Sequence, residues 1–75
     1  MVYYVIEFQT NGNAGSAIPT AYLDRDDAEA AYHTLLAVAA KSEVRKHGAM
    51  LCNEDLFVIK KEVYVHYTEP EPNAE

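Results

Sequence analysis

The sequence predicts an α+β fold of two layers, ββαββ, in which one helix packs on one face of a four-stranded antiparallel sheet. Residues 2–9 alternate along one apolar face and are rich in aromatic and β-branched types, which is typical of a strand. Residues 25–43 place apolar side chains at helical spacing behind an acidic first turn. Residues 56–67 alternate again. One helix and one antiparallel sheet can then bury their apolar faces against each other.

The first two strands are expected to form a hairpin. Residues 10–16 are mostly Asn, Gly, Thr and Ser, which make turns and tolerate positive φ, so the chain should reverse there. Residues 17–23 form a weaker second strand. Pro19 cannot donate to a strand neighbour, which restricts this strand to an edge or a bulge.

The helix is predicted from about Arg25 to Ser42 or Glu43, with Asp24 as N-cap. Cations near its end, among them Lys41, complement the helix dipole. The side expected to face the sheet holds Ala28, Ala31 or Tyr32, Leu35, Val38 or Ala39, and Ser42.

Six consecutive apolar residues, 35–40, make this helix apolar on all sides over nearly two turns. A helix on one small sheet needs only one apolar stripe, so we expect a second partner. Another copy of the chain fits best, and small alanines favour contact between helices in a dimer. The residues expected at this oligomer interface are Tyr32, Leu36, Ala37 and Ala40.

The last part of the chain is expected to form a short strand at 49–52, a turn at 53–55 and a long strand at 56–67. In the long strand, apolar residues share one face and polar residues the other. With the apolar side toward the helix, the exposed sheet face would carry Tyr3, Glu7, Gln9, Lys60, Glu62, Tyr64 and His66.

Length and charge indicate one domain, residues 1–68, followed by a disordered acidic tail with two prolines, residues 69–75. The net charge is −6, and without the three acids of the tail nine acids face six bases. The single cysteine, Cys52, excludes an internal disulfide, and the N-terminus resembles neither a secretion signal nor a membrane span. We therefore expect a cytoplasmic protein that does not contact membranes, for which direct binding to nucleic acid is disfavoured.

Aromatic rings with polar tips on the expected exposed face suit a flat polar ligand or a protein partner. The alternative is a solvated face on which Lys60 and Glu62 pair with neighbouring strands. The basic residues after the helix could hold a phosphate, or they could only complement the helix end. The residues expected to bind a ligand are Tyr3, Arg45, Lys46, His47, Lys60, Tyr64 and His66.

We expect no catalytic residues, no metal and no cofactor. The histidines His33, His47 and His66 lack the spacing of metal ligands, and Cys52 is expected to pack as a small hydrophobe. The Gly-rich segment 11–15 has neither a lysine nor a helix directly after it, so it does not have the phosphate-binding pattern.

Several short runs of the chain have a recognisable pattern: residues 3–10, 30–33, 39–42 and 62–64, together with His47. This pattern resembles small uncharacterised open reading frames of bacteriophages and prophages of gut bacteria. The resemblance covers residues 3–67 and implies a viral accessory role in the host cytoplasm. It carries no known catalytic or binding residues.

The function expected from these patterns is non-enzymatic antagonism of bacterial antiviral defence, by sequestering a nucleotide-derived signal at a subunit interface. The first alternative is an inhibitor that binds and blocks a host defence protein such as a nuclease. The second is a structural or assembly component. A catalytic pocket is not expected in a domain of this size with a single helix.

Overall fold

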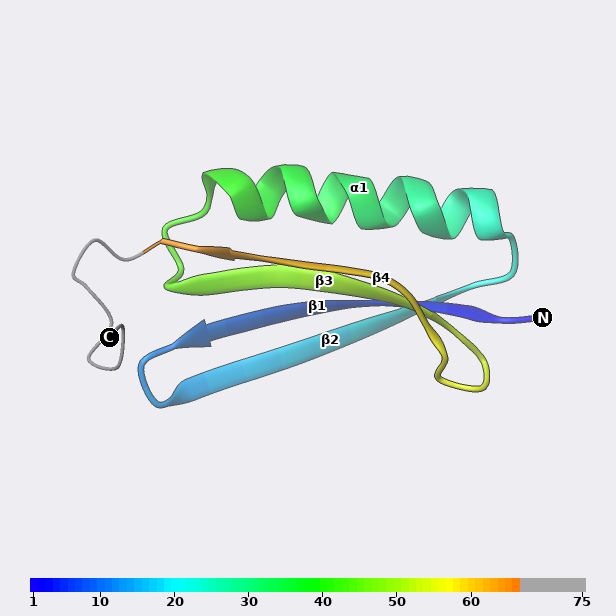
Figure 1. Cartoon of the computed structure of the whole chain (residues 1–75), viewed down its shortest axis with the longest axis horizontal. Coiled ribbons are helices and arrows are strands. Elements are labelled where there is room, and N and C mark those ends of the chain that lie inside the picture. The colour runs from blue at the N-terminus through cyan, green and yellow to red at the C-terminus, as the bar shows by residue number, and fades with distance from the viewer. Residues whose placement is uncertain (67–75) are drawn as a thin grey trace.

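A computed structural model describes residues 1–66 of the chain (Figure 1). In chain order the elements are β1 (Tyr3–Asn11), β2 (Ala14–Tyr22), α1 (Arg25–Lys41), β3 (Lys46–Asn53) and β4 (Val58–Val65). All neighbouring strands are antiparallel, in the order β2-β1-β3-β4. The predicted ββαββ fold is confirmed, and the predicted tail at 69–75 lies outside the described residues.

The hairpin between β1 and β2 turns on two residues, Gly12 and Asn13. Gly12 has φ of 69°, and a positive φ at the first central residue is the pattern of a type II′ hairpin turn. Pro19 lies on β2, which is an edge strand as predicted. At that position the missing N–H costs no hydrogen bond within the sheet.

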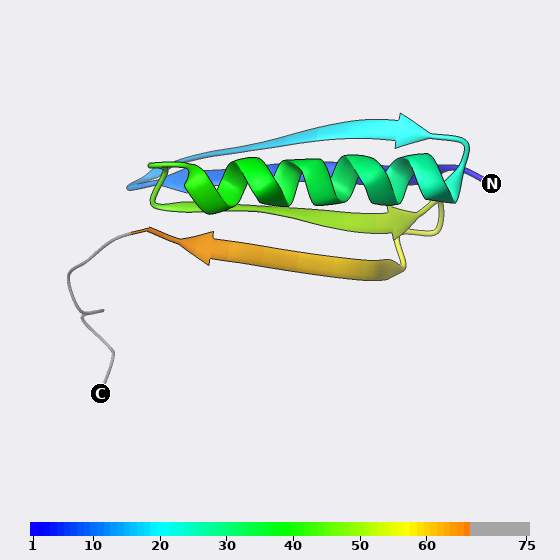
Figure 2. The same ribbon diagram turned by 90° about the horizontal axis from the view of Figure 1, so that it is seen from above.

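Helix α1 lies over the two middle strands, with β2 and β4 at the outer edges (Figure 2). Asp26 and Asp27 occupy its first turn, where the dipole favours negative charge. Asp24 stands at the N-cap but its side chain makes no capping hydrogen bond, in contrast to the prediction. At the other end, the backbone N–H of Ser42 donates to the carbonyl of Ala39 at 3.2 Å.

The core lies between α1 and the strands β1 and β3. Val5 and Leu51, which are paired across these strands, are almost fully buried against Ala28 and Tyr32 of the helix. Small side chains at the contact let the helix approach the sheet closely. Burial raises the pKa of the Tyr32 phenol, because the charged form would lose its hydration.

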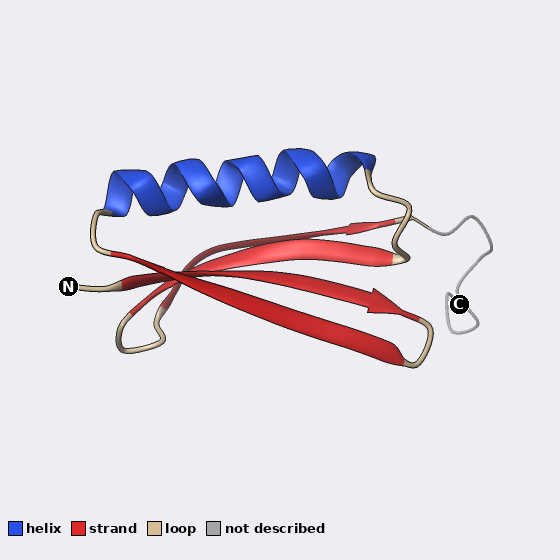
Figure 3. Ribbon diagram, turned by 180° about the vertical axis from the view of Figure 1, so that it is seen from behind, coloured by secondary structure: helices blue, strands red, loops and turns tan. Residues whose placement is uncertain are grey.

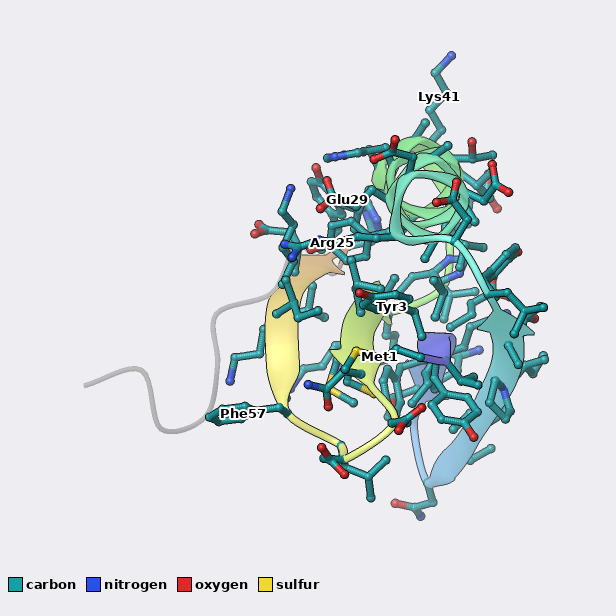
Figure 4. All side chains as sticks on the ribbon, turned by 90° about the vertical axis from the view of Figure 1, so that its right-hand side faces the viewer. Met1, Tyr3, Arg25, Glu29, Lys41 and Phe57 are labelled. Atoms are coloured by element: carbon teal, nitrogen blue, oxygen red, sulfur yellow. The ribbon has the colours of Figure 1, made fainter. Side chains whose placement is uncertain are left out.

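The two faces of the sheet are exchanged relative to our expectation. Val5 packs under the helix, so strand alternation places Tyr3 and Glu7 on that covered side as well. Figure 4 shows Tyr3 between the helix and the sheet, whereas Lys41 points away from the sheet and Phe57 points outward near β4. The polar face that we expected to be exposed is therefore the covered one.

Two of the four residues expected at a helix-to-helix interface pack instead in the core of the same chain. Tyr32 is 3% exposed in the core, and Leu36 packs against the same core. Ala37 and Ala40 are exposed, but their side chains are small. One sheet thus uses more of this helix than the sequence predicted, since aromatic and leucine side chains reach around its flanks. Self-association of the chain stays a prediction.

The basic segment after the helix is not a helix end. The helix ends at Lys41, the only basic residue of its last turn, and Lys46 and His47 begin β3. His47 is 4% exposed, so it cannot act as a surface cation. In the described residues, no helix has the length and apolar character needed to cross a membrane.

Candidate functional site

The candidate site is the side of the sheet that faces away from α1, called here the open face. No helix or strand within residues 1–66 packs on it (Figure 3), although Cys52 on this side is only 1% exposed. Strand pairing and alternation assign its side chains, because directly paired residues share a face. The open face carries Tyr4, Ile6 and Phe8 of β1, Ala17, Pro19 and Ala21 of β2, Met50 and Cys52 of β3, and Val58, Val63 and Val65 of β4.

Several of these apolar side chains are in solvent. Val63 is 55% exposed, Val65 50% and Phe8 38%. Four strands about 4.8 Å apart and eight residues of about 3.3 Å rise give a face of roughly 500 Å². Soluble monomers rarely expose a larger continuous apolar patch, and patches of this size are often functional. The open face is therefore the most conspicuous surface of the described chain.

An open hollow of about 540 Å³ lies on this face, lined by residues of β1, β3 and β4. Phe8, Met50 and Val63 line it, together with Gly48 and Lys61. Gly48 is required by the backbone, since a Cβ there would lie 2.2 Å from the carbonyl oxygen of Glu62. The hollow between Phe8 and Val63 has room for an apolar group from outside.

Charge on the open face has one sign. Among the described strand residues that alternation directs to it, only Lys46 and Lys61 are charged, and both are exposed. The chain as a whole has a net charge of −6, so this face differs from the rest of the molecule. A surface with apolar side chains and carboxylates at its rim would complement it.

The covered face holds a layer of polar contacts between β1 and β3. Nε2 of His47 lies 2.7 Å from Oε2 of Glu7, and the Gln9 side-chain amide donates to the same carboxylate oxygen at 3.3 Å. An ionised carboxylate can only accept, so Nε2 of His47 is the donor when Glu7 is ionised. His47 and Glu7 thus hold β3 and β1 together under the helix.

A second polar contact joins the helix to β4. Lys60 Nζ donates to Oε1 of Glu29 at 3.0 Å, and Arg25 Nε donates to Oε2 of the same carboxylate at 3.0 Å. These hydrogen bonds, first from Lys60 and then from Arg25, lower the pKa of Glu29 below its ordinary value of 4.5. Lys60 therefore links the sheet to the helix through its contact with Glu29.

The other residues expected to bind a ligand do not form one site. They lie on β4, directly after it, and in the segment before β3. Tyr64 and His66 stack on β4 and the segment after it, and Nε2 of His66 lies 2.7 Å from the carbonyl oxygen of Ala39. Arg45 accepts a backbone hydrogen bond from His66. Of the seven expected ligand residues, only Lys46 lies on the open face.

Nothing in the described part of the chain indicates a metal centre. No three His, Cys, Asp or Glu side chains within residues 1–66 gather where they could hold an ion. Cys52 is 1% exposed and packs as a small hydrophobe, as expected.

The sequence did contain a signal for the open face. Tyr4, Ile6 and Phe8 form an apolar row in the sequence, and our prediction places the helix over this more apolar side of the sheet. The rows of β3 do not correct this expectation, because Met50 and Cys52 on one side are as apolar as Ala49 and Leu51 on the other. Comparison with protein-family models, with curated proteins and with solved structures finds no match for this chain.

Proposed function

We propose that this chain is a non-enzymatic protein-binding module whose open face covers an apolar surface, edged by carboxylates, on another protein. The observation that carries the proposal is a sheet face that no helix or strand within residues 1–66 covers and whose described strand residues are apolar except for Lys46 and Lys61. Burying about 500 Å² on each side gives roughly 1,000 Å² in total, the lower bound for a specific interface. An apolar anchor of the partner would fill the hollow over Gly48.

Charge distinguishes this partner from a second copy of the chain. The described strands of a second copy present the same two lysines and no acid on this face, so face-to-face association brings like charges together. A partner with Asp or Glu at its rim instead gains attraction at both positions.

The resemblance to phage open reading frames supplies a setting for this proposal. There the partner is a bacterial defence protein, for instance a nuclease, and covering its surface blocks it without chemistry. Sequestration of a nucleotide has less support, because Tyr3, His47 and Lys60 lie on the covered side of the sheet.

The test begins with a photo-crosslinking amino acid in the bacterial host. It is placed at Phe8 on the open face or, as a control, at His33, which is exposed on the helix. A protein crosslinked only from position 8 is identified by mass spectrometry and purified. Its affinity for the parent chain and for two aspartate variants is then measured by calorimetry.

Two valines give a matched pair of variants. Val63 on the open face is 55% exposed and Val38 on the helix is 53% exposed. Val63→Asp should weaken binding at least tenfold, because it places a carboxylate in an apolar contact, and Val38→Asp should change it less than twofold. Equal effects of the two variants overturn the proposal. A parent chain that sediments as a dimer, and that Val63→Asp dissociates, assigns the face to a second copy and overturns it as well.

A further inference from the structure

We infer that a second site, independent of the open face, binds a primary alkylammonium group in a cleft between α1 and β2. The cleft has a volume of about 270 Å³. It forms because the helix lies over the middle strands and leaves the helix side of the edge strand β2 in solvent (Figure 2). Its walls include Val5, Ile18 and Leu35, and its polar groups include Glu7, Thr20 and Thr34.

Glu7 provides the negative charge of this cleft. Its side chain is 20% exposed, and one oxygen, Oε2, takes the hydrogen bonds from both His47 and Gln9. These contacts fix the carboxylate, while neither uses Oε1. Within residues 1–66, no lysine or arginine lines the cleft. A carboxylate held in this way can receive a cation from solvent without first losing an ion pair to Lys or Arg.

The hydroxyl groups complete a set of acceptors. Thr34 donates its own proton to the carbonyl oxygen of Ala30 at 2.9 Å, so the lone pairs of its Oγ1 are left to accept. Thr20 adds a second hydroxyl on the β2 side. An alkylammonium has three N–H donors and no acceptor, which matches one carboxylate and two hydroxyls.

The apolar walls fit the remainder of such a ligand. Val5 and Leu35 belong to the helix side of the core, and Ile18 is 52% exposed at the outer rim. A four-carbon stem can lie along them while the ammonium reaches Glu7. The volume is just below that of drug-sized pockets, so a small amine or a single lysine side chain is the matching size.

Nuclear magnetic resonance titration of the full chain tests this inference, with n-butylammonium chloride as the probe. Signals of Ile18, Thr20, Thr34 and the His47 ring should shift together and saturate at a dissociation constant on the order of 1 mM. The neutral analogue n-butanol should not produce these shifts at the same concentrations. An acetylated and amidated Gly-Lys-Gly peptide distinguishes the sources. Binding of the peptide indicates a lysine of a partner, and binding of n-butylammonium alone indicates a free amine.

Three variants decide the outcome. Glu7→Gln removes the charge and should weaken binding at least tenfold, whereas Asp26→Asn, at an exposed acid outside the cleft, removes the same charge and should not. Thr34→Val retains the shape and should weaken binding several-fold, which keeps the test informative if Glu7→Gln does not fold. Equal shifts in the Glu7→Gln and Asp26→Asn proteins, or shifts spread over the acidic surface, overturn the inference. Neither result depends on the open face.

Discussion

Glu7 and His47 meet across β1 and β3 with 2.7 Å between Oε2 and Nε2, although 40 residues separate them in sequence. The contact lies beneath the helix, where His47 is 4% exposed. The other ring nitrogen, Nδ1, has no hydrogen-bond partner within the described residues. A single strong contact therefore has to fix the buried ring.

Removing His47 should cost more stability than neutralising Glu7. His47→Ala leaves the carboxylate without its nearest donor and opens a void, so we expect a loss of about 2–3 kcal/mol. Glu7→Gln keeps an oxygen that can accept from Nε2, and we expect about 1 kcal/mol or less. Urea unfolding followed by circular dichroism measures both. A loss for Glu7→Gln as large as that for His47→Ala would contradict this prediction.

Acid should weaken the contact of Glu29 on α1 with Lys60 on β4. Lys60 and Arg25 lower the pKa of Glu29 in the folded chain below 4.5, so the unfolded chain takes up this proton first as the pH falls. The stabilisation is complete above about pH 4.5 and is lost as the pH falls through the lower, folded pKa. Unfolding free energies at several pH values should therefore fall less steeply for Glu29→Gln than for the parent.

Two variants give that experiment its controls. Glu43→Gln removes an exposed acid and should retain the acid dependence of the parent chain. Lys60→Met removes the larger cause of the pKa shift and should flatten the profile more than Arg25→Met does. The reverse order of the two would contradict our assignment of Lys60 as the main partner.

Gly48 should not tolerate a methyl group. A Cβ at this position would lie 2.2 Å from the Glu62 carbonyl oxygen and 2.8 Å from the Val63 Cα, so β3 and β4 would have to separate. We expect Gly48→Ala to lower the unfolding free energy by about 3 kcal/mol. Gly15→Ala is the control, since its nearest contact would be 3.7 Å, and it should change stability by less than about 0.5 kcal/mol. Thermal unfolding of the two proteins compares them, and similar melting temperatures would contradict this explanation.

Replacing Leu56 with glycine should stabilise the folded chain. It is 70% exposed in the turn between β3 and β4 and has φ of 64°, a conformation that is costly for a residue with a Cβ. Leu56→Gly should raise the unfolding free energy by about 0.5 kcal/mol, because the relief of strain exceeds the added freedom of the unfolded chain. Leu23→Gly, at an 83% exposed residue with negative φ, should lower it by about 0.5–1 kcal/mol. Chemical denaturation measures both, and a loss at position 56 equal to that at 23 would refute the prediction.

The sequence by itself determined the order and type of the elements. The helix begins at Arg25 as expected, and β2 with Pro19 is an edge strand. These features depend on local signals, namely turn residues, helix spacing and the missing N–H of proline. The observed strand ends differ from the predicted ones by a few residues. One of the larger differences is at β3, which begins at Lys46 and not at Ala49. Pairing with β1 extends it, and pairing is not a local property.

Only the tertiary structure decided which side of the sheet the helix covers. Both sides carry apolar residues, and alternation along one strand cannot rank them. Val5 and Leu51 are paired under the helix, while Phe8 and Val63 are left on the other side. Short helix side chains such as Ala28 fit against the first pair, and a helix about 10 Å wide covers only the middle of the sheet. The identity of the open face, and with it the candidate site, follows from this packing of distant segments.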